Sequence, residues 1–494
     1  MTALALMLGA VAAALSFSNW RSSLFLCVLV GLLQDPLRKL APNQPAYFVV
    51  LVGVVFGAAW LGALLGRVRL GPNAMQGWKQ HMGTPFGLFL ALVALQAFQS
   101  YARFGSAMMT GIGLMVWLAP VPAIVLAYQF ALRRGMGGLR RWLVFYCGAA
   151  MVSLAGVYLQ FAGVDWRALG EVGPGLTIYG GVEGGILKAF SGFFRSSELA
   201  AWHTAAIAAG VFMLFTTRRL TLGRLALAGA IVAVLLGLGL LTGRRKMLVE
   251  VMVFLSVYLV LVAWYRRGAA RQAVLAALVG VLGYGAAVGL MDPDIINRKS
   301  ADRQQETVAR GERFKGYAVR GRSVVEDVPN RFANLGVAPI AWAVNGFGWF
   351  GAGLGTGSQT GTGNEIASEI NRGAAEGGLG KITMELGVPG LLLMVWLLVA
   401  FVRFVSRALA FTTRASPPHA RLAYGLVALL AAKVASFSVA SQAYSDLFVL
   451  LIMGWTVGFI LAMPVLAARA QAAAQAPRPQ PAPPLRRGQP AWAK

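Results

Sequence analysis

Three consecutive cations stand between two apolar runs of the sequence, with no polar spacer on either side. The stretch GLGLLTGRRKMLVEVMVFL, residues 237–255, contains Arg244, Arg245 and Lys246. A guanidinium group offers forked N–H donors that match phosphate oxygens, so this triplet could bind an anion. The alternative is that the side chains extend to lipid phosphates and that Lys246 pairs with Glu250, one helical turn further along.

A second pair of cations precedes a predicted helix. In GILKAFSGFFRSSELAAWHTA, residues 185–205, Lys188 and Arg195 come before a Ser-Ser pair that is typical of a helix N-cap, and Glu198 falls in the first turn. A helix N-terminus beside cations favours an anionic ligand. The alternative is that both cations face lipid headgroups.

A third group combines glycines with charged residues. GFGWFGAGLGTGSQTGTG, residues 346–363, is followed by NEIASEINRGAAEGGLGKITMELGVPG, residues 364–390. The glycines permit close backbone approach to a substrate, although a flexible linker has the same composition. Lys381 is followed by Ile rather than Ser or Thr, which excludes a nucleotide P-loop.

Two acids flank the start of the helix that follows this segment, Glu376 and Glu385. We expect Glu385 to face a polar neighbour or a cavity, because an ionisable group at membrane depth seldom faces lipid. Arg372 and Lys381 lie beside these acids and are further candidates for a supporting role.

We predict no metal site. His203 is expected to be a packed polar residue, since no second His or Cys lies near it in the sequence. Cys27 and Cys147 both lie inside apolar runs and are interpreted as small core residues.

The composition of the chain determines what kind of elements must position these residues. Of 494 residues, 57% are hydrophobic and only 13% are charged, which indicates an integral membrane protein and excludes a soluble enzyme. The net charge of +26 is attributed to cytoplasmic loops rather than to nucleic-acid binding, because membrane proteins collect Lys and Arg there.

Eleven apolar runs are long enough to cross or nearly cross a bilayer. They are residues 45–65, 85–102, 106–129, 140–163, 199–217, 225–243, 247–265, 272–291, 382–404, 421–440 and 443–467. The first 34 residues fit either one interrupted span or a hairpin. The sequence therefore predicts an all-α integral membrane protein with about 12–13 transmembrane helices.

Short basic connections set the predicted orientation. Residues 133–141, 217–224, 265–271 and the Arg403–Arg421 group contain no acid and are separated by even numbers of spans, so all are predicted to be cytoplasmic. The loop 164–198, the Arg244–Lys246 turn and a long loop then share the outer side. This predicts one outer site for an anionic, membrane-tethered substrate.

The predicted organisation has four parts. They are a transmembrane region (1–291), a large periplasmic loop (292–380), C-terminal transmembrane helices (381–467) and a disordered cytoplasmic tail (468–494). The aromatic part of the loop, residues 338–355, is expected to lie on or in the membrane surface.

Four segments in order resemble the O-antigen ligase and O-antigen polymerase superfamily, over roughly residues 185–400. SGFFRSSELAAW is similar to the family's turn that opens a helix after a basic residue, and LTGRRKMLVE to its Ser-Arg motif at the outer end of a hairpin. GFGWFGAGLGTG resembles its Gly-rich segment, and MELGVPGLLL its Glu-x-Gly-x-x-Gly helix entry. The resemblance implies a GT-C-like, polytopic glycosyltransferase.

The resemblance implies metal-independent and cofactor-free transfer of a glycan from undecaprenyl pyrophosphate to an acceptor hydroxyl, at the periplasmic face of the bacterial inner membrane. Arg245 would bind the pyrophosphate with Arg244 as a helper, and Lys188 or Arg195 would stand at the family's first basic position. The implied partners are the lipid-linked oligosaccharide, a glycan acceptor and membrane lipids, together with flippase and chain-length regulator proteins, but no nucleic acid.

The sequence departs from the family at one position. Where many ligases of the superfamily have a His, this chain has Glu376, which is the predicted base for the acceptor hydroxyl. This difference favours a polymerase of exopolysaccharide or O-antigen repeat units over a ligase that transfers glycan to the lipid A core.

Two non-enzymatic alternatives are a transporter or flippase of a lipid-linked glycan and a scaffold of an export complex. Acids are scarce at the centres of the predicted helices, with Asp446 the main exception, which argues against the transporter.

Overall fold

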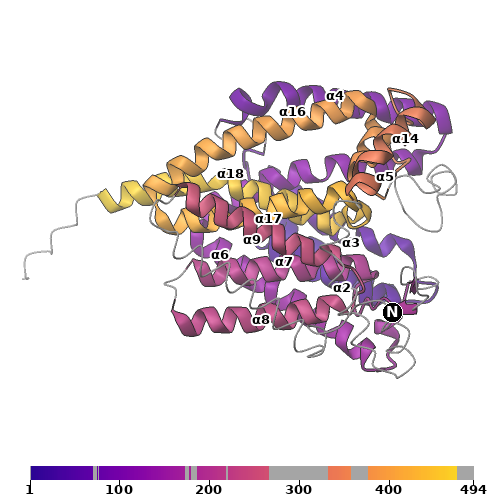
Figure 1. The fold of residues 1–494 in the computed structure, drawn as a ribbon, viewed down its shortest axis with the longest axis horizontal. Coiled ribbons are helices and arrows are strands. Elements are labelled where there is room, and N and C mark those ends of the chain that lie inside the picture. Colours follow the sequence, from indigo (N-terminus) through magenta and orange to yellow (C-terminus); the bar gives the residue numbers. More distant parts are fainter. Residues whose placement is uncertain are drawn as a thin grey trace, which may run out of the picture.

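The computed structural model describes residues 2–70, 75, 77–172, 177–179, 186–217, 221–265, 332–357 and 376–475. In these residues, long helices lie roughly alongside one another, with their axes close to horizontal in Figure 1. Eight helical stretches are long and apolar enough to cross a membrane: Ala46–Leu65, Trp78–Phe104, Ala107–Phe161, Ser197–Thr216, Lys246–Tyr265, Gly378–Ala415, Pro417–Val439 and Leu447–Gln475. The chain is therefore an α-helical, multi-pass membrane protein.

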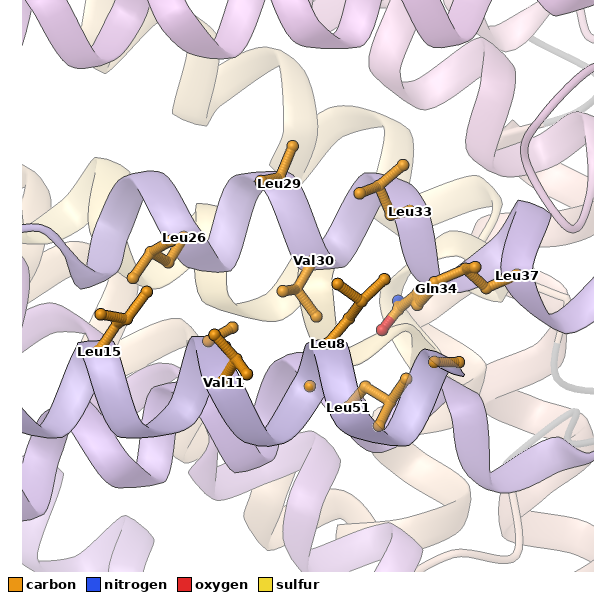
Figure 2. Close-up of a pocket in the computed structure, with 13 residues that line it drawn as sticks. Leu8, Val11, Leu15, Leu26, Leu29, Val30, Leu33, Gln34, Leu37 and Leu51 are labelled. Atoms are coloured by element: carbon orange, nitrogen blue, oxygen red, sulfur yellow. The ribbon is translucent and has the colours of Figure 1, made fainter. Parts of the chain in front are cut away.

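The first residues form a hairpin of helices rather than one interrupted span. α1 (Thr2–Ser18) and α2 (Ser23–Leu40) are followed by η1 (Ala46–Val50) and α3 (Leu51–Leu65). A Cβ atom at Gly62 of α3 would lie 2.1 Å from the Phe17 carbonyl oxygen, so glycine permits the close contact of α3 with α1. A pocket of about 200 Å³ between α1 and α2 is lined by apolar residues and Gln34 (Figure 2).

The next elements are α4 (Trp78–Phe104), α5 (Ala107–Leu118) and α6 (Pro120–Phe161). α6 doubles back at Gly135, whose φ of 62° is left-handed. Pro120 lies against Gly454, and the Trp142 ring lies 5.8 Å from the Trp455 ring. In one straight helix these α6 residues would be about 33 Å apart. The chain therefore turns sharply at Gly135, within the basic segment 133–141, between two antiparallel helical halves of α6.

A short two-stranded hairpin connects α6 to the central helix. β1 (Thr177–Tyr179) pairs antiparallel with β2 (Ile186–Lys188), after η3 (Arg167–Leu169). α7 (Ser197–Thr216) follows, and nearly all of its residues are buried. Its many alanines allow neighbouring helices to pack closely. The Ser196 hydroxyl accepts a hydrogen bond from the Leu199 N–H, which confirms the predicted N-cap.

α8 (Leu222–Leu240) and α9 (Lys246–Tyr265) complete the first half of the described chain. η5 (Phe332–Val337) and α14 (Ala338–Phe347) lie in the predicted loop 292–380, of which residues 332–357 and 376–380 are described. Trp342, Trp349 and Phe350, in and just after α14, are 40%, 67% and 65% exposed. Aromatic side chains exposed in this way suit the membrane–water interface, so the expected surface position stays a prediction for residues 338–350. Residues 351–355 are buried, because they pack against neighbouring helices.

The C-terminal half consists of α16 (Gly378–Ala415), α17 (Pro417–Val439), η6 (Gln442–Ser445) and α18 (Leu447–Gln475). α18 continues past the predicted boundary at 467, since the alanines there favour a helix. The predicted span 272–291, most of the loop 292–380 and the tail from residue 476 lie outside the described residues, so the count of 12–13 helices stays a prediction.

The predicted basic connections meet at one end of the molecule, here named the basic end. The contacts that join them are Arg407 Nη1 to His81 Nε2 at 3.0 Å, Tyr265 Oη to the Ser406 carbonyl at 3.1 Å, Arg421 Nη1 to the Thr216 carbonyl at 3.5 Å and Arg469 Nη1 to the Leu132 carbonyl at 2.8 Å. The opposite end contains η6 and is named the η6 end. In Figure 1 the N-terminus is at the right, and α18 runs to the left.

Candidate functional site

Three consecutive residues at η6 each contact a different element of the chain. The Tyr444 hydroxyl donates to the Lys433 carbonyl (2.6 Å), the Ser445 hydroxyl accepts from Lys381 Nζ (3.0 Å), and Asp446 Oδ2 lies 2.8 Å from Arg195 Nη2. These contacts reach α17, α16 and the loop before α7. Segments that are far apart in the sequence therefore meet at residues 444–446.

Arg195 is held by two carboxylates. Its guanidinium pairs with Asp446, and its backbone N–H donates to Asp35 Oδ2 at 3.0 Å. The Arg195 side chain is 19% exposed, whereas Asp35 and Asp446 are 4% and 2% exposed as whole residues. Asp446 also accepts from the Val449 N–H at 2.9 Å, so it caps α18 and does not lie at a helix centre as the sequence had indicated.

The loop before Arg195 is fixed by polar side chains from α2 and α6. Lys39 Nζ donates to the Gly192 carbonyl at 2.6 Å, and Gln160 Oε1 accepts from the Ser191 and Gly192 N–H groups at 3.0 and 2.8 Å. Gly192 has a φ of 57°, and a Cβ atom there would lie 2.3 Å from the Val157 nitrogen. Only glycine fits this turn, so Arg195 projects from a rigid backbone.

The cation triplet lies against the first turn of α7. Arg244 Nη1 is 2.6 Å from Glu198 Oε1, Arg244 Nε donates to the Ser197 hydroxyl at 3.2 Å, and Lys246 pairs with the other oxygen of Glu198. The Arg244 side chain is 24% exposed. Arg245 is partly exposed, and its carbonyl accepts from the Leu248 N–H at 3.0 Å at the start of α9.

The alternative in which Lys246 pairs directly with Glu250 is not what the structure shows. Lys246 pairs with Glu198 of α7, and Glu250 pairs with Lys433 of α17. The expectation considered only neighbours one turn apart on the same helix, whereas packing between helices supplies the partners here. Lys433 has no counterpart among the sequence predictions.

Glu385 anchors the Gly-rich segment and is fully buried. Its Oε1 accepts from the Gly357 N–H at 3.0 Å, and its Oε2 accepts from Trp117 Nε1 at 2.5 Å. Glu385 thus faces polar neighbours, one of the two expected environments. Residues 351–357 are buried between α4, α5 and α16. Their φ angles of 107° at Gly353 and 83° at Gly355 require glycine, so this part is a packed structural segment and not a flexible linker.

Lys381 and Glu376 lie at different depths near η6. Lys381 is 1% exposed and donates to the Ser445 hydroxyl, so it supports η6 from the interior of the bundle. Glu376 is exposed, and its carbonyl accepts from the Ser441 N–H at 2.6 Å. We call this exposed edge of the η6 end, at Glu376, the rim. A carboxylate there can contact a hydroxyl group that approaches from outside the bundle. Arg372 lies outside the described residues.

Lys188 stands apart from the contacts described at η6. It lies on β2, its side chain is 62% exposed, and its Nζ is 3.5 Å from Glu171 Oε1. Of the two candidates for the family's first basic position, Arg195 is therefore the one that the described contacts join to η6.

His203 is packed inside the bundle. Its ring is stacked with Phe194 and Phe448 at centroid distances of 5.0 and 5.5 Å, and Nδ1 lies 2.9 Å from the Tyr146 hydroxyl. This is the environment of a packed polar residue. Within the described ranges, no group of three or more His, Cys, Asp and Glu residues could hold a metal ion.

The residues discussed above place more cations than carboxylates at the η6 end. The seven cations are Lys39, Arg195, Arg244, Arg245, Lys246, Lys381 and Lys433, and the six carboxylates are Asp35, Glu198, Glu250, Glu376, Glu385 and Asp446. We name these thirteen residues the η6 cluster. Its excess of positive charge favours an anionic ligand.

Sequence reasoning missed three members of this cluster: Asp35, Lys39 and Lys433. Each is a charged residue within or at the end of an otherwise apolar helix, and that feature alone marks a functional candidate. The chain matches no protein-family model, and no curated protein is significantly similar to it in sequence.

Proposed function

We propose that this protein is a membrane glycosyltransferase that polymerises exopolysaccharide or O-antigen repeat units, using undecaprenyl-pyrophosphate-linked glycan as the donor. One observation carries the proposal. Cations from five separate parts of the sequence converge at one end of a membrane helical bundle, with Arg195 and Arg244 partly exposed there. A lipid-linked glycan diphosphate carries about two negative charges and is tethered at this level of the bilayer.

The proposed reaction transfers the glycan from phosphate to a sugar hydroxyl. The acceptor oxygen bonds to the anomeric carbon, the bond from that carbon to the phosphate oxygen breaks, and lipid pyrophosphate leaves with an additional negative charge. Arg245 and Arg244 would bind this pyrophosphate with Arg195, and preplaced cations stabilise charge that grows in the transition state. No metal or cofactor is assigned a step.

Glu376 would accept the proton of the acceptor hydroxyl. Its exposed position, beside the backbone of Ser441, supports this role, because the acceptor must enter from outside the bundle. Lys188 would contact the glycan or lipid at the periphery. Glu385 and Lys381 would support the site from the interior, and His203 would act through packing alone.

The proposed location is the bacterial inner membrane, with the η6 end facing the periplasm and the basic end facing the cytoplasm. The clustering of the basic connections at one end supports this orientation. A flippase that delivers the donor and a chain-length regulator are the proposed protein partners.

The decisive experiment incubates the purified protein with a synthetic undecaprenyl-pyrophosphate repeat unit and EDTA, and resolves the products by length. A ladder of products would establish a polymerase. A single transfer to added lipid A core would establish a ligase instead. If the donor crosses vesicle membranes but no glycosidic bond forms, the protein is a transporter and the proposal is wrong.

A further inference from the structure

A buried ion pair lies one helical turn deeper in the bundle than the partly exposed Arg244–Arg245 turn. Glu250 of α9 and Lys433 of α17 pair directly, and the side chain of each is 1% exposed. Lys433 Nζ also donates to the Trp202 carbonyl at 2.8 Å and lies 3.9 Å from the centre of the Trp202 ring. The Lys433 carbonyl accepts from the Tyr444 hydroxyl. One residue of α17 thus contacts α9, α7 and η6.

Stability alone does not account for this pair. Removing two charges from water is costly, and replacing a buried ion pair by apolar residues of similar size is often neutral or stabilising. The pair is also inside membrane helices, where ionisable residues usually serve function. The question is therefore what the contacts of Lys433 hold in place.

Each contact lies close to a residue of the proposed pyrophosphate site. Glu250 is four residues after Lys246, and Trp202 is four residues after Glu198, so both lie one turn below the Glu198–Lys246 pair. Tyr444 is two residues before Asp446, the partner of Arg195. Fixing Lys433 against these three elements fixes the spacing between the Arg244–Arg245 turn and Arg195.

We infer that Glu250 and Lys433 are positioning residues, which set the distance between the two groups of cations so that both reach one diphosphate. The identity of this ligand rests on the proposed function. The pair itself does not touch the ligand, because both side chains are enclosed by α7, α9, α17 and η6.

A positioning role and a simple effect of net charge predict opposite changes in anion affinity for one variant, Glu250→Gln. Glu250→Gln adds a net positive charge to the η6 cluster, so charge balance alone predicts tighter binding of an anion. Positioning predicts weaker binding, because Lys433 loses the partner that holds it against α9. Lys433→Met weakens binding under both views and serves as the reference.

The main test uses the double variant Glu250→Met with Lys433→Met, which leaves no unpaired buried charge and should keep its fold. We expect its thermal unfolding midpoint to match that of the native protein. Its affinity for geranyl pyrophosphate should fall about tenfold, by analogy with the lower end of the loss caused by removing residues that orient metal ligands. In the polymerisation assay, KM for the donor should rise more than kcat falls. Unchanged affinity in the folded double variant would overturn the inference.

Tyr265→Phe is the matched control. It removes a hydrogen bond from the other end of α9, where the Tyr265 hydroxyl donates to the Ser406 carbonyl. Because this contact is at the basic end, affinity for geranyl pyrophosphate should stay at the native value. An equal loss in Tyr265→Phe and in the double variant would mean that any change to α9 weakens binding, which contradicts the inference.

A ligand-free measurement separates this inference from the proposed function. Spin labels at Arg245→Cys and Arg195→Cys, with Cys27 and Cys147 replaced by Ala, report the distance between the two groups of cations. The distance distribution should broaden or shift in the double variant and remain narrow with Tyr265→Phe. If the native protein binds no geranyl pyrophosphate, the proposed function fails, while an unchanged distribution in the double variant rejects the positioning role.

Discussion

The two ends of the bundle use cations in different ways. At the basic end, Arg421 and Arg469 donate to backbone carbonyls and Arg407 contacts the His81 ring. At the η6 end, Arg195, Arg244 and Lys433 are each paired with a carboxylate. The basic end carries the charge pattern that orients a membrane protein. The η6 end uses carboxylates to fix the direction of these three cations, as an anion-binding site would require.

The largest expected difference between the two ends is the effect on glycan transfer of removing one cation from each. Arg245→Ala should reduce glycan transfer by about 100-fold or more, since loss of one preplaced donor to a developing anion has that scale. Arg403→Ala removes an exposed cation of the basic end and should leave transfer at the native rate. Transfer would be measured with the purified proteins, after confirming equal membrane insertion.

Native transfer rates in both Arg245→Ala and Arg403→Ala would remove the functional distinction between the ends. An equal loss of transfer in both variants would instead indicate that the net charge of the protein, and not the η6 cluster, determines activity.

The rim of the η6 end can be tested separately from its cations. Glu376→Gln keeps the shape of the side chain but cannot accept a proton, so transfer should fall about 100-fold, the lower range for loss of a general base. Donor binding should remain, because the pyrophosphate is assigned to other residues. Single-turnover rates and the affinity for geranyl pyrophosphate would be measured on the same preparation. Native rates with Glu376→Gln would assign the base to another residue.

The role of carboxylates as partners of cations is tested by Asp446→Asn. The amide oxygen can still cap α18 in place of the carboxylate oxygen that accepts from the Val449 N–H, but the charge that pairs with Arg195 is lost. We expect KM for the donor to rise about tenfold, which is the cost expected when one hydrogen-bonded charge partner is removed. The thermal midpoint should also fall, because Arg195 keeps a partly buried charge without its partner, so KM is measured on folded samples.

A matched change at the basic end is His81→Gln, which removes the ring that contacts Arg407. This variant should keep the native KM, because the Arg407 contact serves orientation and packing. A rise in KM with His81→Gln and none with Asp446→Asn would reverse the comparison.

The sequence contained enough information for most of the described helices and for the meeting of its charged segments at one end. Apolar runs predicted most of the spans that the structure describes, and the Ser196–Ser197 pair marked the start of α7, because both signals depend on neighbouring residues. The three charged segments were correctly expected to share one side. Local rules could not supply their partners, since Lys39 reaches Gly192 and Lys433 reaches Glu250 across more than 150 residues of sequence.

The same limit explains Lys246 and Glu385. For Lys246, spacing offered Glu250 as a partner, but the first turn of α7 brings Glu198 closer. For Glu385, the sequence predicted a polar environment, but only the fold shows that its partners are the backbone of Gly357 and the ring of Trp117. Depth in the membrane predicts that a charge needs a partner, and tertiary packing decides which one.

The smallest expected effect concerns backbone rigidity, compared at two glycines that differ in their surroundings. Gly192→Ala, at the η6 end, places a Cβ atom 2.3 Å from the Val157 nitrogen at a φ of 57°. This should destabilise the protein by about 1–3 kcal/mol, the cost of a strained non-glycine backbone. Gly137→Ala, in the turn region of the basic end, meets no atom within 4 Å, and its stability should be unchanged or rise by a few tenths of a kcal/mol, roughly the helix preference of Ala.

Thermal unfolding of both variants in the same detergent would give the two midpoints, and affinity for geranyl pyrophosphate would follow on folded samples. Since Gly192 fixes the loop that carries Arg195, its variant should also bind the diphosphate more weakly, whereas Gly137→Ala should bind it as the native protein does. A destabilised Gly192→Ala with native affinity would mean that this loop can move without disturbing the site. The rigid Gly192 loop would then contribute to stability and not to binding, and the carboxylate partners would be sufficient to orient the cations.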